Sequence, residues 1–518
     1  MKRIAVFIAL AAALAVSAQT IVHIDNPATW KAGSLSSNVG KVVRFDVPFY
    51  VCNNYGGYLT VSPRRIMSPT NQALPSSVEY NTIVSNNSTG TIRLNGVSGY
   101  HRNGERIDGL QAYVNSTSSL TADGTQTFVG NTRADLATRP DLNTDDSTLV
   151  VCAMNLEYFL VENLGSGSMG PSSAAQQARQ YSKIIKALVA CNADLYGLVE
   201  IEQGQGALAK LAQGLTDALG RNFTYINDGK SANGTYTKAG YVYCSDRVKP
   251  YGVLRENNQS VQNRKKMQVF TDNMTGEQFI FSINHFKAKS GTGYGQDADQ
   301  GDGQGIFNYT RTLEAQSVVS SYNSLKYIDP DILIMGDLNA YAKEDPIMTL
   351  TNAGMTDLHR YFHADSSYSY VFRGQAGYLD HALVSAEMLP QVAGMAAYHI
   401  NSDESDDYTY DKSNDETMFR SSDHDPVLVA LHLGRSSTAL ADRLQHGIRI
   451  KRTGNKIQIN NQNAETCHVR IYTPSGQLVL QDRFSGTEYT TEALLPGGVY
   501  IIDVYGYQTR IQQKLIVN

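Results

Sequence analysis

The chain has 518 residues, of which 42% are hydrophobic and 18% charged, which is enough apolar material for the cores of roughly three domains. This composition excludes a wholly disordered protein. The formal net charge of −5, from 44 basic and 49 acidic residues, excludes a protein that coats nucleic acid with a uniformly basic surface. An enzyme that meets a phosphodiester in a local cleft, through metal ions, remains open.

The first residues have the pattern of a secretory signal peptide. A short basic start at 1–3 precedes the apolar run 4–16, and Ser17 and Ala18 supply the small residues of a cleavage site. An apolar run of about thirteen residues is short for a bilayer span. We therefore predict a signal peptide over 1–18 and a secreted protein, extracellular or at the cell surface, without a membrane span.

Residues 19–135 have the pattern of a β domain. Short alternating runs such as 42–47 and 57–61 are separated by clusters of Asn, Gly, Ser and Pro, and no helical period appears. We predict a small OB-like β domain without helices here. The polar stretch 136–147 then has the composition of a linker.

Between residues 148 and 435, apolar strands alternate with helical patterns. The strand 149–154 is apolar throughout, as in strands buried on both faces of a sheet, and 173–190 and 206–219 carry helix formers. Further apolar strands are predicted at 194–199, 239–244, 253–255, 267–271, 279–284, 332–335, 380–384 and 427–433. This alternation predicts one α/β domain with layered sheets.

The last part of the chain is again β in pattern. A polar connector at 436–447 precedes residues 448–518, which have turn signals at 474–476 and 496–498. We predict a small C-terminal β-sandwich.

The cysteines do not form a recognisable framework. They are too few and too scattered for a set of disulfides, and none has the spacing of a zinc site. They are Cys52, Cys152, Cys191, Cys244 and Cys467. We expect buried, apolar thiols, and a Cys152–Cys191 disulfide is the alternative that an oxidising compartment allows.

Polar side chains cluster at strand ends of the middle domain. Asn155 follows the first strand, Glu200 the second, and similar groups follow or precede four others. Because ligand sites in layered α/β folds form where strand ends open into loops, we expect these groups to share one cleft. The wider set is Asn284, His285, Lys287, Asp337, Asn339, Asp380, His381, Asp423 and His424.

The residue types in this set indicate metal-assisted phosphoester chemistry. Amide and carboxylate oxygens suit a hard divalent cation such as Mg²⁺, and two His beside Asp suit proton transfer or stabilisation of a pentacovalent phosphorus. The sequence lacks a Walker loop, a G-x-S-x-G elbow and an H-E-x-x-H motif, which disfavours NTPases, serine hydrolases and zincins. Each segment alone fits an ordinary polar turn, so the prediction depends on their ordered co-occurrence.

This ordered set resembles the endonuclease/exonuclease/phosphatase superfamily, which includes nucleases, inositol-phosphate phosphatases and neutral sphingomyelinases. The resemblance spans about residues 148–433. Segments 284–290, 301–305 and 308–311 also resemble the large secreted bacterial extracellular nucleases, which carry an OB-like domain ahead of the catalytic one. The resemblance implies a central four-layer α/β sandwich, with two packed β-sheets flanked by helices, over 148–435.

The resemblance implies a metal centre that holds Mg²⁺ or Mn²⁺. Glu200 would be the principal ligand, helped by Asn155 and Asp423. Asp337 and Asn339 would orient or deprotonate the attacking water.

The resemblance also implies which residues meet the substrate. His285 and His424 would contact the scissile phosphate, and Asp380 would fix the tautomer of His424, as carboxylate partners of His do. Lys287 and Arg311 are candidates for further phosphate contacts.

Three points stay open at this stage. Glu202 competes with Glu200 as the ligand, since two residues further along a continuing strand it would lie on the same face. The Tyr often found on a middle strand in this superfamily is Tyr241 or Tyr243. Residues 297–303, with three Asp, either form a Ca²⁺ site or a flexible acidic loop, and the missing Glu of an EF-hand loop favours the acidic loop.

The C-terminal block has its own resemblance. Segments 469–477, 494–502 and 514–518 are similar to the C-terminal sorting domain of the type IX secretion system, which implies the type IX machinery as a partner. The alternative is an ordinary small β-sandwich.

Together these patterns predict a secreted, metal-dependent phosphodiesterase, an extracellular endonuclease that hydrolyses DNA, with RNA as an open second substrate. The resemblance implies products with a 5′-phosphate. The alternatives are a phosphatase or sphingomyelinase built on the same metal centre, or a surface-binding protein that has lost activity.

Overall fold

The computed structural model describes residues 20–434 and 448–517, except 56, 168, 257–263 and short gaps in the C-terminal part at 454–455, 462–465, 474–476, 492–494 and 506–509. The predicted signal peptide, the connector 436–447 and the turn at 474–476 lie outside the described residues. Among the described residues, none of the helices is both long and apolar enough to cross a membrane.

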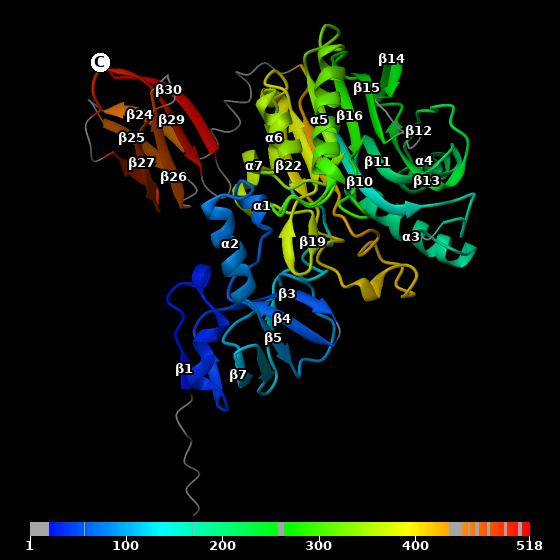
Figure 1. The fold of residues 1–518 in the computed structure, drawn as a ribbon. Coiled ribbons are helices and arrows are strands. Elements are labelled where there is room, and N and C mark those ends of the chain that lie inside the picture. Colours follow the sequence, from blue (N-terminus) through cyan, green and yellow to red (C-terminus); the bar gives the residue numbers. More distant parts are fainter. Residues whose placement is uncertain are drawn as a thin grey trace, which may run out of the picture. The chain divides into compact units, whose positions relative to one another are not determined.

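The chain divides into two compact units that exchange short segments. The first contains the chain up to Pro69, Ser77–Asp135 and Phe372–Ala376, and the second contains Thr70–Ser76, Leu136–Val371 and the chain from Gly377 onward. Figure 1 follows the elements along the chain from blue to red. A stretch of the N-terminal chain therefore belongs to the second unit.

The first unit is built on a nine-stranded sheet in the order β1-β2-β7-β8-β5-β4-β3-β6-β9. Its alternating strands bury one face, with Val43, Phe45, Val61 and Leu94 in the core. The strands are β1 (Thr20–Val22), β2 (Val42–Phe45), β3 (Phe49–Tyr55), β4 (Tyr58–Ser62), β5 (Ile92–Asn95), β6 (Arg106–Ile107), β7 (Gln111–Ser116), β8 (Ser119–Ala122) and β9 (Phe128–Val129).

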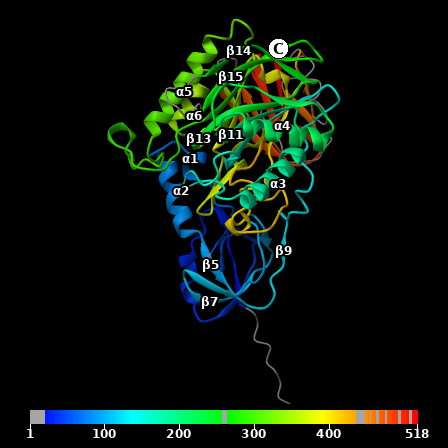
Figure 2. The ribbon, with the colours of Figure 1, turned by 90° about the vertical axis from the view of Figure 1, so that its right-hand side faces the viewer.

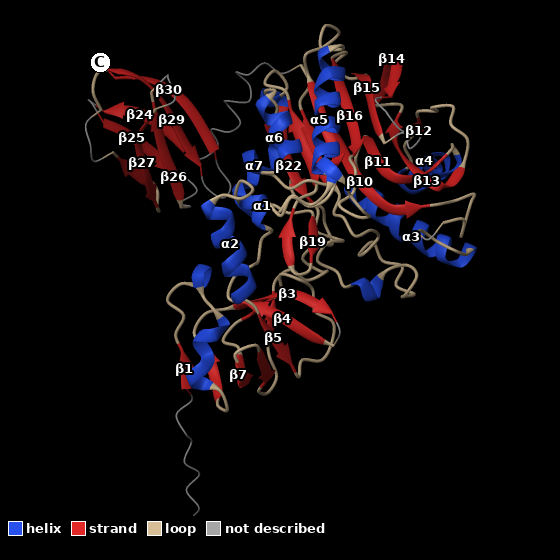
Figure 3. Ribbon diagram, in the orientation of Figure 1, coloured by secondary structure: helices blue, strands red, loops and turns tan. Residues whose placement is uncertain are grey.

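The prediction that this unit has no helix was wrong. Helix α2 (Val78–Thr89) lies between β4 and β5 in the chain, as Figure 3 shows by its colour. Ser77 caps its first turn by accepting a hydrogen bond from the backbone N–H of Tyr80 at 3.0 Å. Its one fully buried residue is Asn87, so it has no apolar stripe that a sequence pattern could reveal.

The second unit contains two six-stranded sheets, so the predicted mixed α/β class is confirmed. The first sheet has the order β12-β13-β11-β10-β23-β22 and the second β14-β15-β16-β17-β21-β18. The strands of the first are β10 (Leu149–Phe159), β11 (Leu195–Gln203), β12 (Phe223–Tyr225), β13 (Asn233–Cys244), β22 (Val392–Ala397) and β23 (Val427–Leu431). Those of the second are β14 (Val248–Glu256), β15 (Lys265–Asp272), β16 (Gln278–His285), β17 (Ile332–Asp337), β18 (Thr356–Asp357) and β21 (Asp380–Val384).

The helices and short elements of this unit complete the list. The α-helices are α1 (Pro69–Gln72), whose first residue belongs to the first unit, α3 (Ala174–Cys191), α4 (Gly206–Leu219), α5 (Asn308–Asn323), α6 (Asp345–Asn352) and α7 (Leu358–His363). A two-stranded hairpin of β19 (Tyr370–Phe372) and β20 (Gln375–Gly377) runs across the unit boundary in sequence. The 3₁₀ turns are Pro27–Thr29, Ala32–Asn38, Gly295–Asp297, Ala364–Ser366, Leu389–Gln391 and Asp406–Tyr408.

Alternation along each strand divides its side chains between two cores. Val151 and Ala153 of β10 pack with Phe281 of β16 and Met335 of β17, so one core is shared by the two sheets. Gly197 of β11 allows this close approach, because a Cβ there would lie 2.7 Å from the ring of Phe281. The other faces pack against helices, α3 and α4 on the first sheet (Figure 2) and α5 and α6 on the second.

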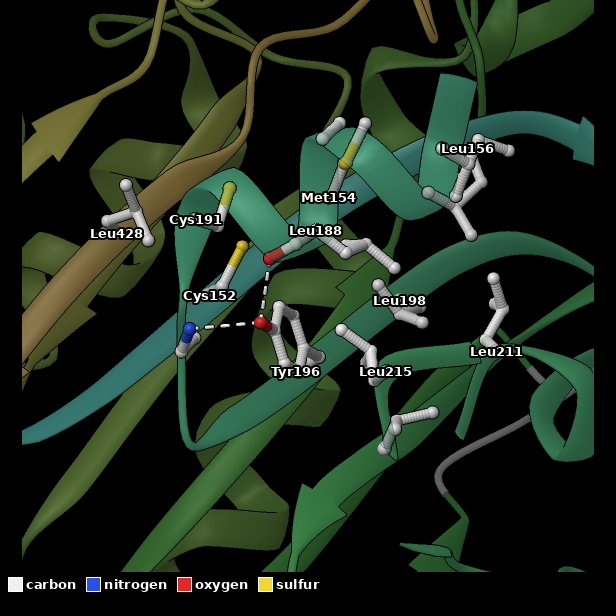
Figure 4. Close-up of a cluster of buried hydrophobic side chains, with 14 of the residues drawn as sticks. Cys152, Met154, Leu156, Leu188, Cys191, Tyr196, Leu198, Leu211, Leu215 and Leu428 are labelled. Atoms are coloured by element: carbon white, nitrogen blue, oxygen red, sulfur yellow. Dashed lines mark hydrogen bonds between the residues drawn. The ribbon is translucent and has the colours of Figure 1, made fainter. Parts of the chain in front are cut away.

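The buried cysteines belong to these cores. Cys152 of β10 and Cys191 at the end of α3 lie near the Tyr196 ring, whose hydroxyl donates to the Leu188 carbonyl at 2.8 Å (Figure 4). All five cysteines of the chain are free and buried. The Cys152–Cys191 disulfide is therefore not formed in this structure, and the expectation of buried apolar thiols is confirmed.

The C-terminal part contains two small sheets of the described residues, with orders β24-β25-β28 and β27-β26-β29-β30. They share a core that includes Ile459, Val469 and Ile502. The strands are β24 (Ile448–Thr453), β25 (Lys456–Asn461), β26 (Cys467–Tyr472), β27 (Leu478–Phe484), β28 (Glu488–Thr490), β29 (Gly498–Tyr505) and β30 (Arg510–Val517).

Candidate active site

The candidate site lies where the carboxyl ends of two parallel strand pairs open into loops. β10 and β11 are parallel neighbours in the first sheet, and β16 and β17 are parallel neighbours in the second. A helix connects the strands of each pair, so both strands of a pair end at the same edge. His285 and Asp337 are direct partners across β16 and β17.

Glycine at 336 makes this pairing possible. Gly336 has φ +117°, and a Cβ there would lie 2.1 Å from the backbone oxygen of Asn284 on the neighbouring strand. Any larger residue would force β16 and β17 apart directly before His285 and Asp337.

A β-bulge places Glu200. Glu200 has φ +57°, and the pairing of β11 with β13 shifts register between Leu198 and Ile201. The bulge interrupts the alternation of side chains along β11. Ile201 packs with Leu198 on the helix-covered face, whereas Val199 packs between the sheets. The strand therefore does not continue regularly through Glu200, which corrects the premise on which Glu202 competed with Glu200.

The neighbouring strand is irregular at the same level. Glu157 and Tyr158 of β10 have φ of +50° and +56°. The Tyr158 backbone N–H donates to Oε2 of Glu200 at 3.2 Å, and the Glu157 N–H donates to Oδ1 of Asn155 at 2.9 Å. Strained backbone of this kind persists only where the surroundings enforce it, and here it orients Asn155 and Glu200.

Two carboxylates and one imidazole converge at this edge. Nε2 of His285 lies 3.5 Å from Oε1 of Glu200 and 3.7 Å from Oδ2 of Asp337. Ligand atoms of the three residues all lie within 4.8 Å of one another, a grouping that can hold a metal ion. Nδ2 of Asn155 donates to Oδ2 of Asp337 at 3.2 Å and so connects the two sheets.

The electrostatics of this cluster favour a bound cation. Burial, together with the charges of Asp423 and Asp337, raises the pKa of Glu200 from 4.5 to about 7. Burial and the nearby Asp380 raise the pKa of Asp337 to about 6. A divalent cation would relieve this repulsion, and the oxygen-rich donor set fits a hard cation, which supplies charge neutralisation at a phosphate oxygen when bound.

Asp337 is held by the residue two positions later. The backbone N–H of Asn339 donates to Oδ1 of Asp337 at 2.8 Å, and its Nδ2 donates to Oδ2 at 3.2 Å. The same Nδ2 lies 3.2 Å from the Phe286 carbonyl oxygen, which it can also reach as a donor. Asn339 therefore fixes the carboxylate and connects it to the loop after β16.

The two histidines have opposite electrostatic surroundings. Burial lowers the pKa of His424, but Asp380, Asp423 and Asp337 outweigh it and raise that pKa well above its usual value. Nδ1 of His424 lies 2.7 Å from Oδ2 of Asp380. Burial and the positive charge of Arg264 lower the pKa of His285 well below its usual value. One imidazole is therefore charged and the other neutral at pH 7.

Sequence reasoning missed the residues that hold the Asp380–His424 pair. Oγ of Ser369 donates to Oδ2 of Asp380 at 2.7 Å and accepts from the Asp380 N–H at 3.1 Å. The Tyr370 ring stacks on His424 with centroids 4.6 Å apart. Both residues lie in or beside the short strand β19, where no strand-end motif marks them. Arg264, beside His285, was missed as well. It directly precedes β15, which the sequence reveals only by its apolar residues.

The structure does not bring Arg311 to this cluster, which corrects the assignment of a phosphate contact. Its guanidinium is 0% exposed and donates to the carbonyl oxygens of Gln304, Ile306 and Lys287 at 2.8, 2.9 and 3.2 Å. Arg311 therefore organises the loop before α5. Lys287 is close enough to the cluster for its positive charge to contribute to the lowered pKa of His285.

The acidic loop is hydrogen-bonded within itself and to α5. Asp297 accepts from the N–H and the hydroxyl of Thr310 at 2.9 and 2.7 Å, and Asp302 accepts from the side chain of Gln304 at 2.9 Å. Among the described residues, these carboxylates form no cluster that could hold a metal.

Tyr241 and Tyr243 both lie away from the cluster. The hydroxyl of Tyr241 is 2.8 Å from the Phe281 carbonyl oxygen, inside the core between the sheets. Tyr243 packs edge-on against Phe270 in the same core. His381, another of the strand-end residues, lies 2.7 Å from the Ala340 carbonyl oxygen through Nε2 and is fully buried.

Glu202 is hydrogen-bonded to the chain segment that follows β10 and is not part of the cluster. Its carboxylate accepts from the backbone N–H groups of Val161, Glu162 and Asn163 at 2.7, 2.8 and 2.9 Å, and from the Asn163 amide at 2.7 Å. These four donors use both of its oxygens.

We expect Glu202→Gln to destabilise the fold while leaving hydrolysis unchanged. The new amide group would face backbone N–H donors that it cannot accept from, at a cost of about 3 kcal/mol. Urea denaturation would measure the loss, and phosphoester hydrolysis by the folded variant would measure the activity. A stable but inactive variant would return Glu202 to the metal site.

Similarity to known proteins is found among solved structures and not among curated proteins. No curated protein matches the chain. Among solved structures, a Bacteroides vulgatus endonuclease/exonuclease/phosphatase is 15% identical, with TM-score 0.38, over 55% of this chain and 98% of its own. The catalytic domain of human Nocturnin is 14% identical, with TM-score 0.37, over 55% of this chain and 94% of its own. A Bacteroides thetaiotaomicron mannosyl-6-phosphatase is 17% identical, with TM-score 0.37, over 54% of this chain and 98% of its own.

A family model covers the part of the chain that holds the site. The model of the endonuclease/exonuclease/phosphatase family matches residues 155–424, more than half of the chain. The match begins at Asn155 and ends at His424, so it includes both ends of the residue set described above. The chain belongs to the endonuclease/exonuclease/phosphatase family.

Proposed function

We propose that this protein is a secreted, divalent-metal-dependent phosphodiesterase, an extracellular nuclease that hydrolyses DNA. Members of its family are phosphoester hydrolases that generally use divalent metals. The observation that carries the proposal is the convergence of Glu200, Asp337 and His285 beside the Asp380–His424 pair. A charged imidazole, a neutral imidazole and buried carboxylates in one place provide the groups that hydrolysis of a phosphodiester needs.

In the proposed mechanism, Glu200, helped by Asn155 and Asp423, would hold Mg²⁺ or Mn²⁺. The carboxylate of Asp337, oriented by Asn339, orients the attacking water and accepts its proton.

The substrate phosphate would meet the two imidazoles. The charged imidazole of His424, held through Nδ1 by Asp380, presents Nε2 to a phosphate oxygen, and the neutral ring of His285 supplies a second hydrogen bond. Lys287 supports phosphate binding from the loop after β16.

DNA is the proposed substrate because segments 284–290, 301–305 and 308–311 resemble secreted nucleases, with RNA as a second substrate. Arg264 and Lys287 add positive charge beside His285. A phosphatase, a sphingomyelinase or an inactive binding protein would use the same scaffold, so these remain outcomes of the test below.

The finer architecture and the location are part of the proposal. We infer that the second unit is the four-layer sandwich, supported by the core shared between the sheets and the helices on their other faces. The N-terminal unit would be OB-like, and residues 448–518 would be a type IX sorting domain. The signal-peptide pattern supports export.

The test is cleavage of supercoiled plasmid by the chain from residue 19 onward, in Mg²⁺, in Mn²⁺ with Ca²⁺, or in EDTA. We expect metal-dependent nicking that Asp337→Ala abolishes, because the carboxylate that takes the proton is gone. Asp217→Ala is the control, since Asp217 lies on α4, accepts a hydrogen bond from Gln213 and should leave cleavage unchanged.

Each outcome separates the alternatives. Plasmid that stays intact under every condition would refute the nuclease, and a panel of sphingomyelin and inositol phosphates would then identify a phosphatase or sphingomyelinase. No hydrolysis of any phosphoester would indicate a binding protein. Equal cleavage by Asp337→Ala would overturn the mechanism.

A further inference from the structure

A short segment from the N-terminal part of the chain is built into the unit that holds the candidate active site. Residues 70–76 belong to that unit, although the chain on both sides belongs to the other unit. Thr70 and Asn71 are polar and only 2% and 1% exposed. Buried polar side chains cost free energy unless they are hydrogen-bonded, so their partners show what they hold in place.

Thr70 completes a buried ion pair. Its Oγ1 donates to Oε1 of Glu344 at 2.8 Å, and its carbonyl oxygen accepts from the Lys343 N–H at 2.9 Å. Nζ of Lys289 donates to both oxygens of Glu344 at 2.5 and 2.6 Å. Lys289 lies two residues after Lys287, so this contact fixes the loop that carries the candidate phosphate contact.

Asn71 holds the backbone directly ahead of Asp380. Its Oδ1 accepts from the Tyr378 N–H at 3.2 Å. The next residue, Leu379, accepts from the Leu338 N–H at 2.8 Å, which connects it to the loop after β17. Asp380 follows and pairs with His424 at 2.7 Å. The backbone N–H that Asn71 holds, that of Tyr378, is therefore two residues along the chain from the carboxylate that fixes His424.

We propose that Thr70 and Asn71 are positioning residues for the active site, Thr70 for the loop of Lys287 and Asn71 for the Asp380–His424 pair. The activity part of this inference rests on the proposed phosphodiesterase function. They act through Glu344 and Tyr378, to which their side chains are hydrogen-bonded. Residues 70–76 are then part of the hydrolytic machinery.

Asn71→Ala tests the contact that leads to Asp380. Because small displacements of catalytic groups are costly, we expect kcat to fall about ten-fold with KM unchanged. Asn71→Asp keeps an oxygen acceptor and should recover kcat, because Nδ2 of Asn71 has no hydrogen-bond partner among the described residues.

Asn87→Ala is the matched control. Asn87 is also a buried Asn with a backbone partner, the Met67 carbonyl oxygen at 2.8 Å, but it lies in the N-terminal unit. It should lower stability without changing kcat. If Asn71→Ala behaves in the same way as Asn87→Ala, the positioning role is wrong.

Thr70→Val tests the other contact with almost no change in shape. Loss of one hydrogen bond to a buried carboxylate should raise KM about five-fold or more while kcat is kept, and Thr70→Ser should restore KM. An unchanged KM in Thr70→Val would remove Thr70 from the proposal.

Hydrogen exchange of the full chain gives a readout that does not need activity. In Asn71→Ala, amides of residues 378–380 should exchange faster than in wild type, whereas Asn87→Ala should leave them unchanged. If wild type hydrolyses no phosphoester, the proposed function fails while this exchange still tests the positioning. Unchanged exchange at 378–380 would overturn the role of Asn71 even in an active enzyme.

Discussion

Glu200→Gln should abolish metal-dependent hydrolysis and, in metal-free buffer, stabilise the protein at neutral and higher pH. The amide loses the charge that would hold the cation, and we expect a fall in kcat/KM of at least about a thousand-fold, comparable to the loss of a principal electrostatic group. The gain in stability follows from the buried, repelling carboxylates. Plasmid cleavage and urea denaturation in EDTA would measure the two effects.

The pH dependence has a definite sign. The pKa of Glu200 in the folded protein is about 7 and its usual value is 4.5, so the folded state holds the proton more tightly. The stabilisation is complete below about pH 4.5 and is lost as pH rises through about 7, by about 3 kcal/mol. Wild type in EDTA should therefore lose stability from pH 5 to 8 at about this scale, and Glu200→Gln should show a flatter profile.

Glu202→Gln is the matched control, because it makes the same change two residues away. It should lose stability and keep activity, the reverse of Glu200→Gln. If the two variants behave alike, the assignment of Glu200 as a metal ligand and of Glu202 as a structural carboxylate is wrong.

Asp380→Asn should lower kcat about 10³- to 10⁴-fold, with little change in substrate binding. In the corresponding arrangement of other hydrolases, an Asn in place of the Asp leaves geometry intact but gives the imidazole the wrong tautomer. Here Oδ2 of Asp380 lies 2.7 Å from Nδ1 of His424. Steady-state kinetics on a soluble phosphodiester would measure the fall.

The pH profile of this variant distinguishes a charge effect from a loss of structure. Asp380 is the largest of the charges that raise the pKa of His424, so His424 should lose its proton at lower pH in Asp380→Asn. The basic limb of kcat/KM should therefore move to lower pH. Ser369→Ala removes only the hydroxyl that orients Asp380, and should shift this limb much less. A basic limb that stays in place would show that His424 does not act as the charged group.

Strands and amphipathic helices with strong patterns were predictable. The apolar run 149–154 became β10, and the helical patterns at 173–190 and 206–219 became α3 and α4 within one or two residues. Such patterns report burial directly, because a strand between two covered faces must be apolar throughout. Helix α2 was missed because it buries almost nothing apolar.

The positions of the candidate site residues were also predictable, because strand ends at one edge of a layered fold converge. The direction of each side chain was not. Arg311 falls within a motif that resembles nucleases, yet its guanidinium points into backbone carbonyls. A local pattern gives the residue type and the element, while the direction depends on which polar partners the folded chain offers.

The sequence by itself determined the family, the α/β class of the central region and the strand ends that carry Asn155, Glu200, His285, Asp337 and His424. Only the tertiary structure decided which of them meet. The bulge at Glu200, the Ser369 contact to Asp380 and the insertion of Thr70 and Asn71 depend on pairings between segments far apart in sequence. Such contacts have no signature in local hydrophobic periodicity, because they are hydrogen bonds of single polar groups whose partners are brought near only by folding.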